Sequence, residues 1–306
     1  MTSYTVGIDI GGTKIAVGAM AESGELISRR SERTPAHSGP QAILATAIRM
    51  ATELMTVYPI GAIGVGSAGV IDPVARKVVA ATDQLSNWAG TQLGTILEAA
   101  LGVPVTTHND VHAHAVGEAF TGAGRGQHIV LVTAIGTGIG GAVVIDGVPQ
   151  TGAHNVGGHL GHIPVEEAAG LVCPCGRVGH LEAISSGKAL LQLYLRLGGS
   201  ADLVSTREVV AATETDPIAH AAVTTSALAL GRAMGGLVNV VDPDVLIIAG
   251  GMRNAGELWW SNVKKGIQTE VMPILKDIPI VPAQLGDDAA IIGAAKCALD
   301  ARGVAA

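Results

Sequence analysis

Two short glycine-rich segments carry the residue types that can hold phosphate groups. The first runs Asp9-Ile-Gly-Gly-Thr-Lys14 and the second runs Gly136-Thr-Gly138. Glycine lets backbone N–H groups come close to phosphate oxygens, and threonine and lysine side chains add further donors. The candidate phosphate ligands are Gly11, Gly12, Thr13, Lys14, Gly136, Thr137 and Gly138. Asp9 can hold Mg²⁺ through water beside such phosphates; for either segment alone, an ordinary tight turn is the alternative interpretation.

Neither segment is a dinucleotide-binding or P-loop motif. The spacing Gly-x-Gly-x-x-Gly occurs at 64–69 and at 136–141, but a dinucleotide site needs a helix directly after the third glycine. Gly69 is followed by Val-Ile-Asp-Pro, and the residues after Gly141 predict a strand. Any nucleotide would therefore bind through the glycine hairpins.

A carboxylate follows the predicted strand that ends in His108-Asn109-Asp110. Asp110 can be a general base that takes the proton of a hydroxyl group during phosphoryl transfer, with Asn109 orienting neighbouring hydroxyls. The alternative is that Asp110 is the N-cap of the helix that follows. Both interpretations stay open at this point.

Four possible metal ligands lie in one loop-rich segment. Cys173-Pro-Cys175 is followed by His180, and His162 lies eleven residues before the first cysteine. Two thiolates and two imidazoles can complete a tetrahedral Zn²⁺ site of structural type. Such a site would pin the loop so that His159 and Glu182 face a pocket. The alternative is a flexible loop with two free thiols.

The elements that must position these residues alternate between strand and helix, which predicts an α/β fold. The expected strands are 6–10, 15–20, 60–66, 103–107, 129–135, 142–145 and 245–249. The expected helices are 40–58, 91–101, 111–120, 188–197, 217–239 and about 289–300. The strand, glycine turn and strand around Gly11 return 125 residues later at Gly136. We therefore expect two halves of related topology, each with one glycine-tipped hairpin.

Composition narrows the class of protein. The chain is 48% hydrophobic and 15% charged, so it can bury a large core. Its net charge of −7 and the lack of a basic cluster argue against a nucleic-acid partner. Because no uninterrupted apolar run reaches roughly 18 residues and no secretory signal is recognisable, we expect no membrane association and a cytoplasmic protein.

The motifs, in this order, resemble those of the ROK sugar kinases of the actin-like ATPase superfamily. The resemblance rests on DIGGTK (9–14), GVGSAGVID (64–72), Asn87, HNDVHAHAVGE (108–118), IGTGIGG (135–141), GHLGH (158–162), CPCGRVGHLEAISSG (173–187) and IIAGG (247–251). It implies an actin-like, ribonuclease H-like α/β fold with two domains closing around a central cleft. We expect a smaller domain of 1–118, with the C-terminal helix of about 289–306 packing back on it. The larger domain would span 119–288.

The resemblance also implies roles for residues. ATP phosphates would lie on the two hairpins, Asp110 would be the catalytic base, and the 6-hydroxyl of a sugar would accept the phosphoryl group. The positions that match sugar-contacting residues are Asn87, Asn109, Asp110, His162 and Glu182. Gly250 and Gly251 match the segment near the adenosine. A homodimer is expected from the family alone.

Two departures from the family pattern bear on metal and sugar. His180 stands where the family usually has a third cysteine, so the zinc site is expected to be Cys2His2. His159 stands where glucokinase-like members have a glutamate that accepts hydrogen bonds from sugar hydroxyls. N-acetylmannosamine kinases of the family resemble this chain there and at Ser67-Ala68-Gly69, which favours N-acetylmannosamine and makes Ser67 and Gly69 candidate substrate contacts. Ser86-Asn87-Trp88 resembles glucokinases instead, so glucose stays the alternative.

The family contains transcriptional repressors with a DNA-binding domain before the core, for which we expect no room because the first hairpin starts at residue 6. A sugar-sensing protein without catalysis is the remaining alternative. Asp110 beside intact DIGGTK and GTGIGG segments favours an enzyme.

Overall fold

The computed structural model describes residues 4–304. They group into two compact units. The first holds the chain up to Gln127, Val144–Gly157 and the chain from Gln284, and the second holds His128–Val143 and Gly158–Ala283. The expected domains, 1–118 with 289–306 and 119–288, stay a prediction, and their residues 1–3 and 305–306 lie outside the described part.

The first unit contains a five-stranded sheet in the order β3-β2-β1-β4-β7. Its strands are β1 (Tyr4–Ile10), β2 (Lys14–Met20), β3 (Leu26–Arg33), β4 (Ile60–Ser67) and β7 (Val105–Asn109). The pairs β1–β2 and β2–β3 are antiparallel, while β4 runs parallel to both β1 and β7. A two-stranded sheet of β5 (Val70–Asp72) and β6 (Lys77–Ala80) follows β4 in the chain.

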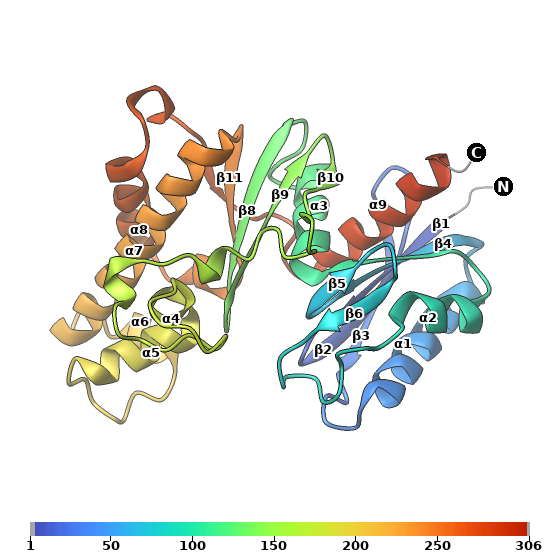
Figure 1. Ribbon diagram of the computed structural model, residues 1–306, viewed down its shortest axis with the longest axis horizontal. Coiled ribbons are helices and arrows are strands. Elements are labelled where there is room, and N and C mark those ends of the chain that lie inside the picture. The colour runs from blue at the N-terminus through green and yellow to red at the C-terminus, as the bar shows by residue number, and fades with distance from the viewer. Residues whose placement is uncertain (1–3, 305–306) are drawn as a thin grey trace. The chain divides into compact units, whose positions relative to one another are not determined.

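Helices cover both faces of this sheet (Figure 1). They are α1 (Pro40–Met55), α2 (Leu93–Leu101), α3 (Asp110–Thr121) and α9 (Ala289–Val304). A Cβ added to Gly64 would lie 1.7 Å from the Ala294 carbonyl oxygen, so this strand position must be glycine for α9 to approach. Val65 points to the opposite face, into a core that it shares with α1 and α2.

The second five-stranded sheet repeats the topology of the first, in the order β10-β9-β8-β11-β12. Its strands are β8 (Ile129–Ile135), β9 (Ile139–Ile145), β10 (Val148–Pro149), β11 (Val245–Ala249) and β12 (Ile280–Pro282). β8 and β9 begin at 129 and 139, each 125 residues after β1 and β2, which begin at 4 and 14. The predicted duplication is confirmed.

The other helices of the second unit are α4 (Glu182–Ser185), α5 (Gly187–Arg196), α6 (Thr206–Ala211), α7 (Pro217–Val241) and α8 (Glu257–Glu270). Short 3₁₀ turns are η1 (Leu160–His162), η2 (Glu166–Ala168), η3 (Gly251–Asn254) and η4 (Pro273–Leu275), and η5 (Gly286–Asp288) lies in the first unit. By length and composition α7 alone among the described helices can cross a membrane, but 56% of its apolar window is buried within the protein. It is a core helix of its unit, packed along α8.

The predicted strands and helices are present, with corrections at their ends. The second hairpin turns over three residues and β9 starts at Ile139, whereas the prediction extended the turn to Gly141. β7 starts at Val105 instead of 103, and α1 ends at Met55 instead of 58. β3, β5, β6, β10, β12, α4, α6 and α8 were not predicted.

Candidate functional site

The first hairpin places its glycine tip between β1 and β2. The Gly11 amide donates to the Lys14 carbonyl at 2.9 Å, which closes the turn. Thr34, just beyond β3, donates its hydroxyl to the Gly11 carbonyl at 2.7 Å and its amide to the Thr13 carbonyl at 3.0 Å. The backbone of the tip is therefore fixed from outside, and neither of these contacts could be read from the sequence motif.

Charged groups surround this tip. Lys14 Nζ lies 2.6 Å from Asp287 Oδ2, so the lysine is held by an acid from the far end of the chain. Burial is the largest cause that raises the pKa of Asp9 from 3.8 to about 7. The charge of Asp110 raises that pKa further, while Lys14 opposes the shift. A bound divalent cation would reverse this shift, because it favours the ionised carboxylate.

The predicted base is next to its predicted neighbours. The N-cap of α3 is Asn109, whose Oδ1 accepts from the amides of Val111 at 2.9 Å and His112 at 3.2 Å. Asp110 is the first residue of the helix, so its interpretation as the N-cap is wrong. Asn109 Nδ2 donates to the Gly69 carbonyl and to Asp110 Oδ1, both at 2.9 Å. These bonds fix the Asp110 carboxylate in one orientation at the helix N-terminus, where a negative charge is favoured.

Ser67 and Gly69 join the same part of the first unit. Ser67 is fully buried at the end of β4, and its hydroxyl accepts a bond of 3.1 Å from Trp88 Nε1. Gly69 has a φ of 105°, and a Cβ there would lie 2.7 Å from the Ala80 carbonyl oxygen. Asn87, directly before Trp88, is exposed and has a φ of 58°. In the first unit, hydrogen bonds thus join Gly69, Asn109 and Asp110, and Ser67 lies opposite Asn109 in the β4–β7 strand pair.

The second hairpin is supported differently. The Gly136 amide donates to the Gly138 carbonyl at 2.9 Å, and the Gly136 carbonyl accepts from the Gly187 amide at 2.9 Å. Glu182, at the start of α4, accepts a bond of 2.7 Å from the Ile139 amide. A Cβ on Gly138 would meet the same Glu182 carboxylate oxygen at 2.7 Å. Glu182, expected to contact sugar, therefore also supports the tip of this hairpin.

Gly250 and Gly251 follow β11 and begin η3. Gly250 has a φ of 83°, and a Cβ there would lie 2.3 Å from the Ile135 carbonyl oxygen, so the turn after β11 needs glycine to lie against β8. A hollow of about 690 Å³ opens beside η3, between the end of α6 and the starts of α7 and α8. Its lining includes Thr213, His220, Asn254 and Gly256. No such hollow could be located from the sequence.

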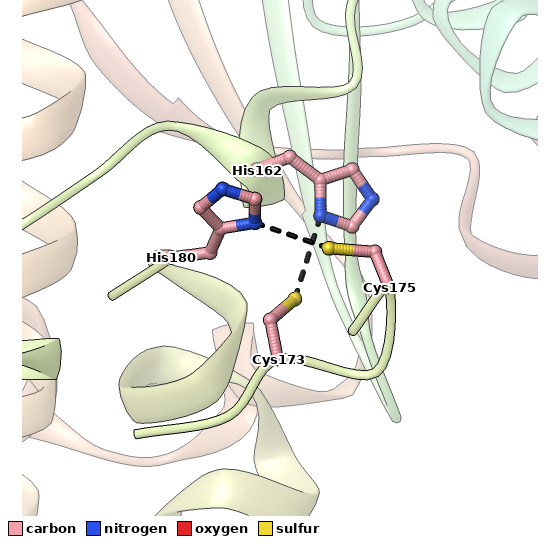
Figure 2. A group of neighbouring side chains, drawn as sticks. All are labelled: His162, Cys173, Cys175 and His180. Carbon is pink, nitrogen blue, oxygen red and sulfur yellow. Dashed lines mark hydrogen bonds between the residues drawn. The ribbon is translucent and has the colours of Figure 1, made fainter. Parts of the chain in front are cut away.

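The four predicted metal ligands converge in the second unit, as Figure 2 shows. Their ligand atoms all lie within 4.8 Å of one another. Cys173 Sγ is 3.5 Å from His162 Nδ1, and Cys175 Sγ is 3.2 Å from His180 Nδ1. In a tetrahedral zinc site, ligand atoms are separated by roughly 3.3–3.8 Å, given usual Zn–N and Zn–S bond lengths. The donor set and its spacing therefore fit Zn²⁺.

The pKa shifts of two of these side chains are consistent with a cation site. Burial lowers the pKa of His162, which keeps the imidazole neutral and able to ligate. Burial also raises the pKa of the Cys173 thiol to about 11, so the thiol stays protonated unless a positive charge is nearby. A zinc ion would supply that charge, because a coordinating thiol loses its proton to the cation's field.

His159 lies three residues before the candidate metal ligand His162, and the two rings stack with their centroids 6.1 Å apart. It is half-buried at the start of η1. A zinc ion on His162 would thus fix the ring beside which His159 packs. The candidate zinc ligands and the predicted specificity residue therefore form one local structure.

Comparison with known proteins gives the same family along the whole chain. The sequence model of the ROK family matches residues 5–301. The glucokinase of Thermotoga maritima is 30% identical over 304 residues, which cover 95% of each chain. The structure of the ROK hexokinase from Thermus thermophilus is similar with a TM-score of 0.87 and 30% identity, over 98% of this chain and 99% of that one. The structure of a ROK family glucokinase from Streptomyces griseus, solved with glucose and AMPPNP, is similar with a TM-score of 0.80 and 30% identity, over 97% of this chain and 100% of that one. The predicted actin-like α/β fold is confirmed.

Proposed function

The chain belongs to the ROK family, and on that premise we propose that it is an ATP-dependent kinase that phosphorylates the 6-hydroxyl of a hexose or N-acetylhexosamine, with N-acetylmannosamine preferred. Relatives along the whole chain support the general activity of a sugar kinase. One observation carries the reaction: Asn109 caps α3 and holds the Asp110 carboxylate at the end of β7.

Asp110 is the general base of the proposed transfer. Its carboxylate accepts the proton of the sugar 6-hydroxyl as that oxygen attacks the γ-phosphorus of ATP, and ADP leaves with the electrons of the broken P–O bond. Asn109 keeps the carboxylate oriented and offers its amide to neighbouring hydroxyls. Ser67, Gly69 and Asn87 lie on the segments next to this pair and complete the proposed sugar contacts of the first unit.

The two hairpins are the proposed phosphate ligands. Gly11, Gly12 and Thr13 offer backbone and hydroxyl donors, and Lys14 adds a positive charge. Gly136, Thr137 and Gly138 offer donors without a charge. Asp9 is the residue that would hold Mg²⁺, which neutralises phosphate charge when bound.

The second unit supplies the remaining contacts in this proposal. His162 and Glu182 would contact the sugar, although each has a second task, in the metal cluster and under the hairpin tip respectively. Gly250 and Gly251 would lie near the adenosine, and the hollow beside η3 is large enough for it. Structural zinc on His162, Cys173, Cys175 and His180 would hold segment 158–187 in place.

His159 supports the preference for N-acetylmannosamine. A glutamate there accepts hydrogen bonds from sugar hydroxyls in glucokinase-like relatives, whereas an imidazole ring is bulkier and presents two ring nitrogens in place of two carboxylate oxygens. This change alters which substituent at C2 of the sugar can fit. Glucose is the second candidate, because glucokinases are among the relatives that match nearly the whole chain and Ser86-Asn87-Trp88 resembles that group.

The test is ADP release with N-acetylmannosamine, glucose, N-acetylglucosamine and mannose at matched concentrations, with Asp110→Asn as the blank. The highest kcat/KM with N-acetylmannosamine supports the proposal in full. A preference for glucose supports the sugar kinase activity but contradicts the specificity inferred from His159. His159→Glu is the matched variant, and it is expected to shift preference towards glucose.

A sugar-sensing protein without catalysis is the alternative of another class. It predicts sugar binding with no ADP release from wild-type protein, so the same assay separates the two functions. We also propose a cytoplasmic homodimer. Light scattering at several protein concentrations tests the dimer, and a mass of one chain throughout contradicts it.

A further inference from the structure

Lys14 at the first hairpin is held by a turn near the C-terminus. Asp287, in η5, accepts from Lys14 Nζ at 2.6 Å and lies 3.5 Å from an Arg29 guanidinium nitrogen. Its neighbour Asp288 pairs with Arg29 at 2.8 Å. Asp287 and Asp288 thus lie side by side in the chain, but only Asp287 contacts the lysine.

Hydrogen bonds to a buried acid of α3 fix the chain just before η5. Glu118 is fully buried, and its two carboxylate oxygens accept three backbone amides. Oε1 accepts from Leu285 at 2.8 Å, and Oε2 accepts from Gln284 at 3.1 Å and from Ala123 at 2.9 Å. A buried carboxylate that is fixed by several charge-assisted bonds has little freedom, so it sets the position of the chain just before η5.

We propose that Glu118 and Asp287 are positioning residues for ATP binding: Glu118 fixes the turn, the turn presents Asp287, and Asp287 holds Lys14 at the tip of the first hairpin. The inference rests on the proposed function, since it assigns a task to residues around the phosphate site. Neither acid needs to touch ATP itself.

The physical need for such a device follows from lysine itself. A long lysine side chain loses much of its conformational freedom when it is ordered. Lys14 is about one-third exposed, so no tight packing orders it. An ion pair from a fixed turn restricts the ammonium group before the nucleotide arrives, so less ordering remains for the binding step.

The deciding comparison is Asp287→Asn against Asp288→Asn, a matched pair on adjacent residues of one turn. Binding of AMPPNP with Mg²⁺ is measured by titration calorimetry, and the KM for ATP and kcat are measured separately. An exposed ion pair contributes up to about 1 kcal/mol, so Asp287→Asn is expected to weaken binding about three- to fivefold, with kcat changed less than KM. Asp288→Asn is expected to bind like wild type. Tighter binding by Asp287→Asn overturns the proposal, because it would mean that Asp287 only repels phosphate.

A double-mutant cycle tests whether Asp287 acts through Lys14. In a Lys14→Met background, Asp287→Asn should have no further effect on nucleotide affinity. Independent, additive losses would contradict the positioning role. For Glu118→Gln, hydrogen exchange should quicken at 284–288 and nucleotide affinity should fall in parallel. If this buried variant does not fold, the cycle with Lys14 decides alone.

Failure of the proposed function gives a different pattern. Wild type that binds AMPPNP but releases no ADP with any sugar would remove the kinase and leave the variants of Asp287 and Lys14 interpretable. Wild type that does not bind AMPPNP overturns the positioning role as well.

Discussion

The two glycine hairpins have the same strand and tip lengths, but they differ in the residues that flank and support the tip. Both consist of two seven-residue strands around a three-residue tip, within sheets of the same strand order. At equal places, the first has Asp9 and Lys14 where the second has Ala134 and Ile139. The first tip is thus flanked by the charged side chains of Asp9 and Lys14, while uncharged residues stand at the same positions beside the second tip.

The supports of the two tips differ in the same sense. In the first unit the hydroxyl of Thr34 and the acid Asp287 hold the tip from separate parts of the chain. In the second unit the Glu182 carboxylate binds the backbone of the tip itself, at the Ile139 amide. The same duplicated scaffold therefore gives two different tips. The first tip is suited to bind a cation together with phosphate, and the second is suited to bind phosphate through uncharged donors.

The largest effect is expected when the first tip is made like the second. Asp9→Ala copies Ala134 and removes the proposed metal ligand. Because stabilisation of phosphate charge by a held metal is worth several kcal/mol, kcat/KM should fall at least about a hundredfold. Steady-state kinetics over a range of Mg²⁺ concentrations checks this. Unchanged activity at every Mg²⁺ concentration would show that the charged tip has no special task.

Removal of the metal cluster should affect the second unit and spare the first. Cys173→Ser, or a strong chelator, is expected to lower the thermal midpoint by about 10 °C, as for a loss of roughly 3 kcal/mol. Sugar affinity should fall as well, because segment 158–187 includes His159 and Glu182. Calorimetry with elemental analysis tests this, and active protein that contains no zinc would refute the structural role.

The pH dependence of stability should distinguish the two tips. Because the pKa of Asp9 is raised from 3.8 to about 7, the folded chain keeps a proton that the unfolded chain loses near pH 4. The free energy of unfolding therefore falls between about pH 4 and 7 and is constant above. Asp9→Asn should remove this decline and be more stable than wild type at pH 8 by about 1–4 kcal/mol.

Denaturant titrations of both proteins at pH 5, 6, 7 and 8, without Mg²⁺, give the measurement. Parallel curves for wild type and Asp9→Asn would contradict a raised pKa. With Mg²⁺ present, wild type should gain more stability at pH 8 than at pH 6, whereas Asp9→Asn should gain little at either pH.

The smallest effect concerns the glycines of the second tip. Gly138→Ala places a methyl group 2.7 Å from Glu182 Oε2, so the carboxylate must move away from the Ile139 amide. We expect a loss of about 1–2 kcal/mol in stability. Gly136→Ala is the matched control, since nothing lies within 4 Å of its Cβ position. Equal midpoints for the two variants would show that Glu182 does not support this tip.

Local sequence signals predicted the hairpins, β4, β11 and the long helices because their apolar periods and glycine turns are strong. β3 was missed because its sequence, LISRRSER, is charged and mostly exposed, so it lacks an apolar alternation. α8, with two adjacent tryptophans among polar residues, has a similarly weak pattern. Both elements form because neighbouring strands and helices of the fold pack on them.

The candidate site shows the same limit. Motifs predicted the metal ligands and the Asn109–Asp110 pair, because those residues are close in sequence or lie at a strand end. The contact of Lys14 with Asp287 spans 273 residues, and that of Ile139 with Glu182 spans 43, so no local pattern contains them. The sequence also left undecided which residue caps α3, because the adjacent residues Asn109 and Asp110 are both of types that cap helices.

The most direct test of the proposed mechanism measures sugar binding and phosphoryl transfer on the same preparations of wild type and Asp110→Asn. Calorimetry gives the sugar affinity, and ADP release together with phosphorus NMR gives the rate and the phosphorylated position. Removal of a general base costs about a hundred- to ten-thousandfold in rate, so we predict equal sugar affinity, a loss of that size in kcat, and a 6-phosphate from wild type. Comparable turnover by Asp110→Asn would contradict the account.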